Sequence, residues 1–189
     1  MFHLDAWHTA ITVWTAIGIL WIITAAFEHS TPRPPAQRSS HNYNYLFLLI
    51  PAALLLFDPQ LRLGPLNRAL FQSSVLGLAL VFAGAAFTGL ARLRLGSNWS
   101  ANPRIREGHT LSTSGPYRIV RHPIYTGILL TSLGTAVILG ETRGYIAIVL
   151  AFIGYLIKSR MEDRLLAERF GLDFAAYCRR TKALIPGIL

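Results

Sequence analysis

Residues 114–139 read SGPYRIVRHPIYTGILLTSLGTAVIL, and along this stretch a polar loop passes into a long apolar segment. Proline is tolerated at the first position of a helix, where its missing N–H costs nothing, so Pro123 predicts a helix start. The run that follows it, as far as Leu139, contains no charged residue. The stretch therefore predicts an apolar helix whose polar end carries Arg121 and His122.

The start of this helix is suited to an anionic group. The first N–H groups of a helix have no partner within it, and the helix dipole places partial positive charge at the same end. Arg121 and His122 lie directly beside Pro123. We therefore expect an anionic ligand group at this point, in a catalytic site at a membrane surface.

The composition argues against a soluble domain, since 52% of the 189 residues are hydrophobic and only 14% are charged. A spanning helix needs about 20 apolar residues. The first, third and fourth apolar segments meet this length, while the second and fifth are shorter. We expect an all-α integral membrane protein with about five transmembrane helices. The five segments are residues 9–27, 43–57, 69–91, 122–139 and 145–157.

The basic residues give this arrangement an orientation. With five spans, 15 of the 18 Lys and Arg residues lie on one side of the membrane, and such an excess marks the cytoplasmic side. The N-terminus is therefore predicted outside and the C-terminus in the cytoplasm. Because the positive charges flank the spans, we expect membrane lipid, and not nucleic acid, as the partner of the net charge of +9.

The chain divides into two regions. Residues 1–91 are predicted to form three N-terminal transmembrane helices, and residues 92–189 a catalytic region. The latter has a cytoplasmic loop, two further transmembrane helices and an amphipathic tail helix over residues 158–177, with a break at Gly171. Cys178 is the only cysteine, which excludes an intrachain disulfide and a cysteine-rich metal site, and no metal is expected.

Small and aromatic residues recur within the apolar segments. Trp7, Trp14 and Trp21 are spaced by seven residues, which favours packing or lipid contact over ligand binding. Glycines in the third and fourth segments favour close packing between helices. These glycines are Gly77, Gly84, Gly89, Gly127 and Gly134.

Four motifs together resemble the isoprenylcysteine carboxyl methyltransferases and their prokaryotic relatives. They are GSNWS at 96–100, GHTLSTSGPYR at 108–118, RHPIYTG at 121–127, and an acidic pair followed by FG at 170–171. The resemblance covers residues 95–188. It implies an integral membrane enzyme that transfers a methyl group from S-adenosylmethionine, with the cofactor enclosed between the loop, the tail and the cytoplasmic helix ends. The chain has no strand followed by a G-x-G-x-x-G turn, as a Rossmann methyltransferase would.

The resemblance also implies site residues. Substrate binding falls to Lys158, where eukaryotic members have arginine, with Arg160 as a compensating charge. Lysine lacks the planar fork that binds a carboxylate through two hydrogen bonds. The implied cofactor-binding residues are His109, Thr110, Leu111, Ser112, Tyr117, His122, Pro123, Ile124, Tyr125 and Glu162.

Methyl transfer to a carboxylate removes no proton from the nucleophile, so positioning and exclusion of water suffice and no catalytic base is assigned. An amine or thiol acceptor would instead require a base, and His122, His109 or Glu162 would be the candidates. Taken alone, His109 is typical of a histidine at a membrane interface that binds no ligand. A solvated ion pair with Lys158, four residues earlier on the same helix, would also explain Glu162 without a functional role.

Several functions remain open at this stage. The first is methyl transfer to a lipophilic acceptor, either an isoprenylcysteine carboxylate or a phospholipid amine or small lipophilic thiol. The second is a membrane reductase of the sterol-reductase type, which would use NADPH. The third is a non-catalytic protein whose basic loops hold lipid. The sequence leaves the acceptor and the oligomeric state open.

Overall fold

The computed structural model describes residues 2–29, 38–39, 43–58, 60–61, 63–64, 74–96, 104–105 and 110–189. Within these ranges the regular structure is helical apart from two paired two-residue strands, so the prediction of an all-α fold is confirmed. Five α-helices lie in the described residues: α1 (Phe2–His29), α2 (Leu46–Phe57), α4 (Ser74–Leu95), α5 (Pro123–Leu139) and α6 (Thr142–Arg180). The short elements are β1 (Arg38–Ser39), β2 (Arg104–Ile105) and the 3-10 turn η2 (Gly115–Arg118).

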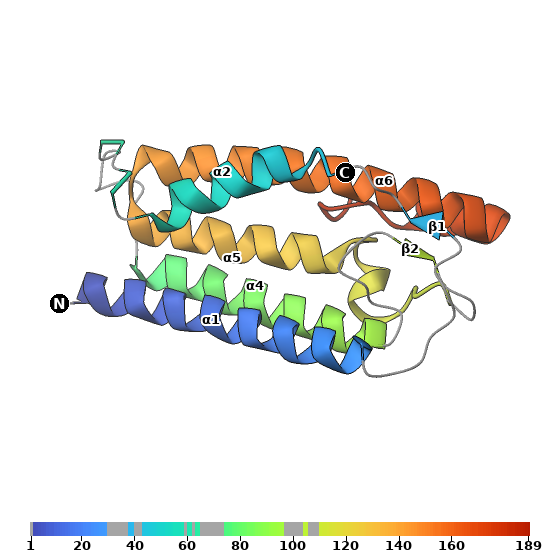
Figure 1. Ribbon diagram of the computed structural model, residues 1–189, viewed down its shortest axis with the longest axis horizontal. Coiled ribbons are helices and arrows are strands. Elements are labelled where there is room, and N and C mark those ends of the chain that lie inside the picture. Colours follow the sequence, from blue (N-terminus) through green and yellow to red (C-terminus); the bar gives the residue numbers. More distant parts are fainter. Residues whose placement is uncertain are drawn as a thin grey trace.

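The helices form an elongated bundle (Figure 1). Helix α4 packs against both α1 and α5, and α6 packs against both α2 and α5. The start of α5, η2, the strand pair and the second half of α6 gather at one end, opposite the end where the N-terminus lies (Figure 1). This gathering brings the polar loop and the tail together.

Helices α4 and α5 approach closely because glycines face each other across their contact. A Cβ added to Gly84 would lie 2.5 Å from the Thr131 nitrogen, and one added to Gly134 would lie 2.5 Å from the Gly77 oxygen. The packing prediction is wrong for Gly89, where an added Cβ would meet nothing within 4 Å. Four of the five glycines therefore serve the helix contact.

The three tryptophans of α1 are half-buried and pack against neighbouring residues of the bundle. The indole N–H of Trp14 donates to Thr135 Oγ1 on α5 at 3.0 Å, and its ring meets Phe57 edge-on at 5.5 Å. Trp7 and Trp21 pack against buried residues at the two ends of the same helix. Their spacing thus marks the face that α1 turns toward its neighbours.

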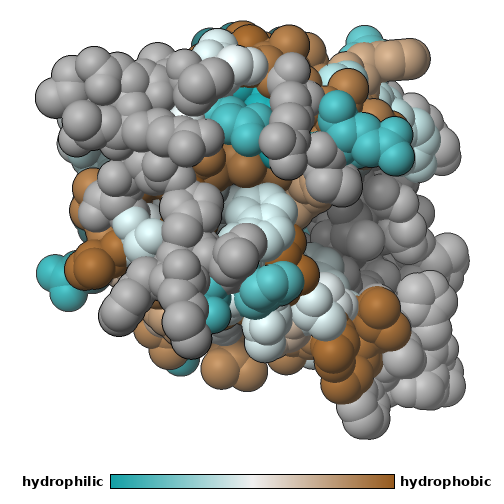
Figure 2. All heavy atoms as spheres, turned by 90° about the vertical axis from the view of Figure 1, so that its left-hand side faces the viewer, coloured by the Kyte–Doolittle hydropathy of each residue, from teal (hydrophilic) through white to brown (hydrophobic). Residues whose placement is uncertain are grey.

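In the described part of the chain, three helices are long and apolar enough to cross a membrane: α1 through residues 5–24, α4 and α6. Helices α5 and α2 are shorter, with 17 and 12 residues. At 1.5 Å per residue, α2 reaches about 18 Å of a hydrocarbon core of about 30 Å. Large apolar side chains such as Phe47 and Val75 are exposed, at 81% and 78%. Hydrophobic residues also reach the rim of the bundle in the end-on view of Figure 2.

The last helix differs from the prediction in one respect. The fifth apolar segment and the amphipathic tail are one helix of 39 residues, with the predicted break at Gly171, where φ is 49° and ψ is −115°. No proline or glycine lies between Gly154 and Gly171, so the helix continues from the apolar part into the charged part. After Arg180 the chain leaves the helix and returns to the start of α5.

Candidate functional site

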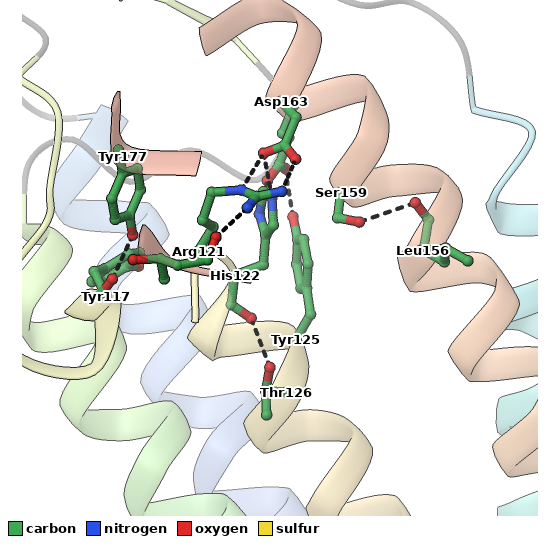
Figure 3. Close-up of polar contacts among 11 residues, drawn as sticks. Tyr117, Arg121, His122, Tyr125, Thr126, Leu156, Ser159, Asp163 and Tyr177 are labelled. Atoms are coloured by element: carbon green, nitrogen blue, oxygen red, sulfur yellow. Dashed lines mark hydrogen bonds and ion pairs between the residues drawn. The ribbon is translucent and has the colours of Figure 1, made fainter. Parts of the chain in front are cut away.

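The polar network at the start of α5 is centred on His122, which precedes the helix as its N-cap. Its Nδ1 lies 3.2 Å from Oε2 of Glu162, and its Nε2 lies 2.8 Å from Oδ1 of Asp163. The two carboxylates are consecutive residues of α6 and take one ring nitrogen each. Figure 3 shows Asp163 above the imidazole. The imidazole ring, only 5% exposed, is therefore held from both sides.

Each carboxylate has a further donor. Arg121 Nη2 lies 2.8 Å from Oδ2 of Asp163, and the Tyr125 hydroxyl donates to Oε1 of Glu162. Buried charges are tolerated when they are paired and hydrogen-bonded, as they are here. The sequence supplies these groups at fixed spacing: Arg121 and His122 end the loop, and Tyr125 follows within the first turn of α5.

The charges in this network favour a protonated histidine. Burial opposes protonation of the imidazole, but its hydrogen bonds to Asp163 and Glu162 and the negative charges of these carboxylates outweigh it, and the pKa of His122 rises to about 9. At neutral pH the site thus holds an imidazolium and a guanidinium against two carboxylates. The two positive and two negative charges balance, and a ligand group of either sign can find a partner of opposite charge among them.

Aromatic rings line one side of the network. Tyr125 stacks on the imidazole of His122 at 5.6 Å between centroids and on Tyr155 at 4.9 Å. The Lys158 ammonium lies 5.1 Å from the ring centroids of both Tyr45 and Tyr125. Lys158 and Glu162 are one helical turn apart on α6, so a cation and an anion border the same stack of rings.

The C-terminal segment fixes the loop before α5 through its backbone. The N–H groups of Arg121 and His122 donate to the carbonyls of Lys182 and Ala183, at 2.7 and 3.0 Å. Thr126 Oγ1 donates to the Leu184 carbonyl at 2.7 Å, and the Arg121 guanidinium also donates to the Thr181 carbonyl. Since Leu184 is only 1% exposed, this segment is packed as well as hydrogen-bonded.

The structure gathers several of the residues that the resemblance implies. His122, Tyr125, Glu162 and Lys158 lie in the network, and Pro123 and Ile124 form the first turn of α5 beside it. Tyr117 is buried against Ile124, and its carbonyl accepts a hydrogen bond from the Tyr177 hydroxyl (Figure 3).

Other implied residues are exposed or half-buried. Thr110 is exposed, Leu111 and Ser112 are half-buried, and Arg160 is exposed on α6. His109 lies outside the described residues.

The sequence interpretation missed several members of this end of the bundle. Asp163 was visible as half of the acidic pair, although its position facing both Arg121 and His122 required the fold. The sequence around Tyr45 and Tyr155 does not indicate that they belong to a site, because an aromatic residue at the end of an apolar segment is typical of a membrane interface. The C-terminal segment contacts the start of α5 through its backbone carbonyls, and such contacts leave no pattern in the sequence.

The chain is similar in sequence to known methyltransferases. Residues 72–173 match the phospholipid methyltransferase family. The chain is 28% identical over 187 residues to a probable protein-S-isoprenylcysteine O-methyltransferase of Oryza sativa, covering 97% of each chain. It is 32% identical over 109 residues to the Arabidopsis thaliana protein-S-isoprenylcysteine O-methyltransferase B, covering 57% of this chain and 50% of that protein.

A shorter match joins the chain to a bacterial protein. It is 43% identical over 82 residues to the cobalt-zinc-cadmium resistance protein CzcN of Cupriavidus metallidurans, covering 43% of this chain and 38% of that protein. The match to the family includes α4, α5 and most of α6 and therefore the network around His122. The resemblance drawn from the motifs is confirmed, and the chain belongs to the phospholipid methyltransferase family, with isoprenylcysteine O-methyltransferases among its relatives.

Proposed function

We propose that the protein is an integral membrane methyltransferase that transfers the methyl group of S-adenosylmethionine to the carboxylate of a lipophilic, isoprenylcysteine-like acceptor. The observation that carries the proposal is the buried network of Arg121, His122, Glu162 and Asp163. It lies where the apolar helix α5 begins, inside the region that matches the family.

The chemistry of these groups fits the cofactor. The amino acid part of S-adenosylmethionine carries an ammonium and a carboxylate, and its ribose carries two hydroxyls. Carboxylates such as Glu162 accept from ammonium and hydroxyl groups, and the start of α5 suits the cofactor carboxylate. The aromatic stack of Tyr125 and Tyr155 offers flat apolar surface beside these charges. Tyr117 and the segment from His109 to Ser112 complete the cofactor-binding residues in this proposal.

When bound, S-adenosylmethionine would supply an electrophilic methyl group. The chain's own residues then need to orient the acceptor and exclude water, because a carboxylate gives up no proton on methylation. The Lys158 ammonium attracts the acceptor carboxylate, and Arg160 adds positive charge nearby. His122 holds Glu162 and Asp163 in place and neutralises part of their charge.

The arrangement of the helices suits an acceptor that is anchored in lipid. The network lies at the end of the bundle where the polar loop and tail gather, one turn from apolar parts of α5 and α6. In this proposal that end faces the cytoplasm, the N-terminus lies outside, and residues 92–189 carry the catalysis. A lipidated protein or small lipophilic molecule is then the substrate.

Titration calorimetry of the detergent-purified protein with S-adenosylhomocysteine tests the cofactor. We expect saturable binding by the wild type and a loss of at least about tenfold in the Glu162→Ala variant, which removes a charged hydrogen-bond acceptor. Asp173→Ala is the matched control, since Asp173 is an exposed carboxylate of the same helix. Binding of NADPH in place of S-adenosylhomocysteine would overturn the proposal in favour of a reductase.

The acceptor is tested by methyl transfer from radiolabelled S-adenosylmethionine in vesicles. A farnesylated cysteine with a free carboxylate is expected to be labelled, and the label should be released by mild base, as expected for a methyl ester. The same compound with its carboxylate amidated is the control and should stay unlabelled. Labelling of phosphatidylethanolamine alone would move the acceptor from a carboxylate to an amine.

A further inference from the structure

We propose that Tyr45, at the N-terminal end of α2, is a positioning residue that holds the Lys158 ammonium in place for the acceptor carboxylate. This inference rests on the proposed function and assigns a role in acceptor binding to a helix outside the predicted catalytic region. It starts from the contact between α2 and α6, whose register places the two side chains together.

The register is set by close contacts along two antiparallel helices. At one end the Arg143 guanidinium donates to the carbonyl of Asp58, which ends α2. In the middle, a Cβ added to Gly154 would lie 2.8 Å from Cδ2 of Leu49, so the helices nearly touch there. Tyr45 precedes Leu49 by one helical turn, and Lys158 follows Gly154 by one turn. Antiparallel pairing therefore brings Tyr45 opposite Lys158.

The contact itself is a cation between two aromatic faces. The Lys158 Nζ lies 5.1 Å from each of the ring centroids of Tyr45 and Tyr125, within the range of attraction between a cation and an aromatic ring. Both rings are held firmly. Tyr45 is only 3% exposed, and Tyr125 is stacked on His122 and Tyr155 and hydrogen-bonded to Glu162.

Lysine needs such support more than arginine does. Its ammonium is a point charge on a flexible four-carbon stem, without the planar fork that fixes the direction of a carboxylate. Two fixed rings limit where the Lys158 ammonium can lie. Of these, Tyr125 also donates a hydrogen bond to Glu162 and stacks on His122. Tyr45 is then the ring whose main contact with the site is Lys158 itself. Its removal should weaken acceptor binding while the cofactor network stays intact.

Three variants separate positioning from general packing. Tyr45→Phe keeps the ring and loses the hydroxyl, while Tyr45→Leu loses the ring and keeps apolar volume. Tyr43→Leu is the matched control, because Tyr43 is exposed and contacts the Tyr45 ring from outside. For each variant, the KM for farnesylated cysteine, kcat and the Kd for S-adenosylhomocysteine are measured in the full-length protein.

The KM for the acceptor is expected to rise roughly five- to tenfold in Tyr45→Leu, as suits the loss of one cation–aromatic contact. In Tyr45→Phe and Tyr43→Leu it should stay within about twofold of the wild type. The kcat and the Kd for S-adenosylhomocysteine should change little in all three.

The inference is overturned when Tyr45→Leu leaves KM unchanged, or when Tyr45→Phe is as impaired as Tyr45→Leu. An equal loss of S-adenosylhomocysteine binding in Tyr45→Leu would also overturn it, because it would show a packing role. A wild-type protein that binds S-adenosylhomocysteine but methylates no carboxylate would instead overturn the proposed acceptor, and the role of Tyr45 with it.

Discussion

Asp163 Oδ1 lies 2.8 Å from His122 Nε2, so a hydrogen bond joins the middle of α6 to the residue before α5 across 41 positions of sequence. The other oxygen of the same carboxylate binds Arg121 at 2.8 Å. One aspartate thus fixes two consecutive basic residues at a helix start. Removing it would take one partner from each of them, while Glu162 and the C-terminal segment would still hold the histidine and the loop.

We expect Asp163→Asn to weaken binding of S-adenosylhomocysteine by at least about tenfold and to lower the unfolding free energy by about 3 kcal/mol, because it leaves the Arg121 guanidinium without its counter-charge and His122 with Glu162 alone. Calorimetric titration and thermal unfolding in detergent measure the two effects. Asp173→Asn makes the same change at an exposed position of α6 and should alter neither. Equal effects of the two variants would contradict the assigned role.

The protonation of His122 predicts a pH dependence of stability. Its pKa is raised from 6.5 to about 9, so the folded protein binds the proton more tightly than the unfolded chain does. The resulting stabilisation is fully present below pH 6.5 and is lost as the pH rises through about 9. The unfolding free energy of the wild type should therefore fall between these pH values.

His122→Gln provides the comparison, since glutamine keeps hydrogen-bonding atoms but does not titrate. Its unfolding free energy should be lower than that of the wild type at pH 6, and the difference should shrink as the pH approaches 9. Denaturant unfolding at a series of pH values measures both curves. Curves that run parallel across this range would show that His122 does not carry the effect.

The sequence was sufficient for the parts of the fold that depend on local composition. Apolar length identified five helices, Pro123 marked the start of α5, and Gly171 marked a break that the structure places inside α6. These features are determined by residue type within a few positions. The merging of the fifth span with the tail was missed, because a change from apolar to charged residues changes the environment of a helix without ending it.

The candidate site was predictable where motif residues touch each other. His122, Tyr125 and Glu162 were expected together and do meet, since each lies on a helix segment that the sequence identified. Tyr45 was not expected, because its contact with Lys158 depends on the register between α2 and α6. The register between the two helices is set by packing at residues such as Gly154, and the sequence alone does not show which residue of α2 lies against it.

The hydrogen bond from Thr126 to the tail predicts a second effect on the site. Thr126→Val keeps the shape of the side chain and removes the donor to the Leu184 carbonyl, at a cost of about 1 kcal/mol. Because the same segment holds the N–H groups of Arg121 and His122, we expect the Kd for S-adenosylhomocysteine to rise severalfold. Amide hydrogen exchange at residues 121–122 should also become faster.

Thr15→Val is the control for this change. Thr15 donates to the Ile11 carbonyl within its own helix, so its loss affects no segment of the site. Binding of S-adenosylhomocysteine should match the wild type. If Thr126→Val behaves like Thr15→Val in both binding and hydrogen exchange, the tail does not position the loop.

The contact between α4 and α5 predicts opposite outcomes for two similar substitutions. A Cβ at Gly84 would lie 2.5 Å from the Thr131 nitrogen and 2.6 Å from the Gly127 oxygen, and backbone atoms cannot move aside as a side chain can. Gly84→Ala should therefore lower the unfolding free energy by about 1–3 kcal/mol. At Gly89 an added Cβ meets nothing within 4 Å, so Gly89→Ala should gain up to about 1 kcal/mol from the higher helix propensity of alanine. Thermal unfolding in one detergent compares the pair, and shifts of the same sign would show that close packing at Gly84 does not hold these helices together.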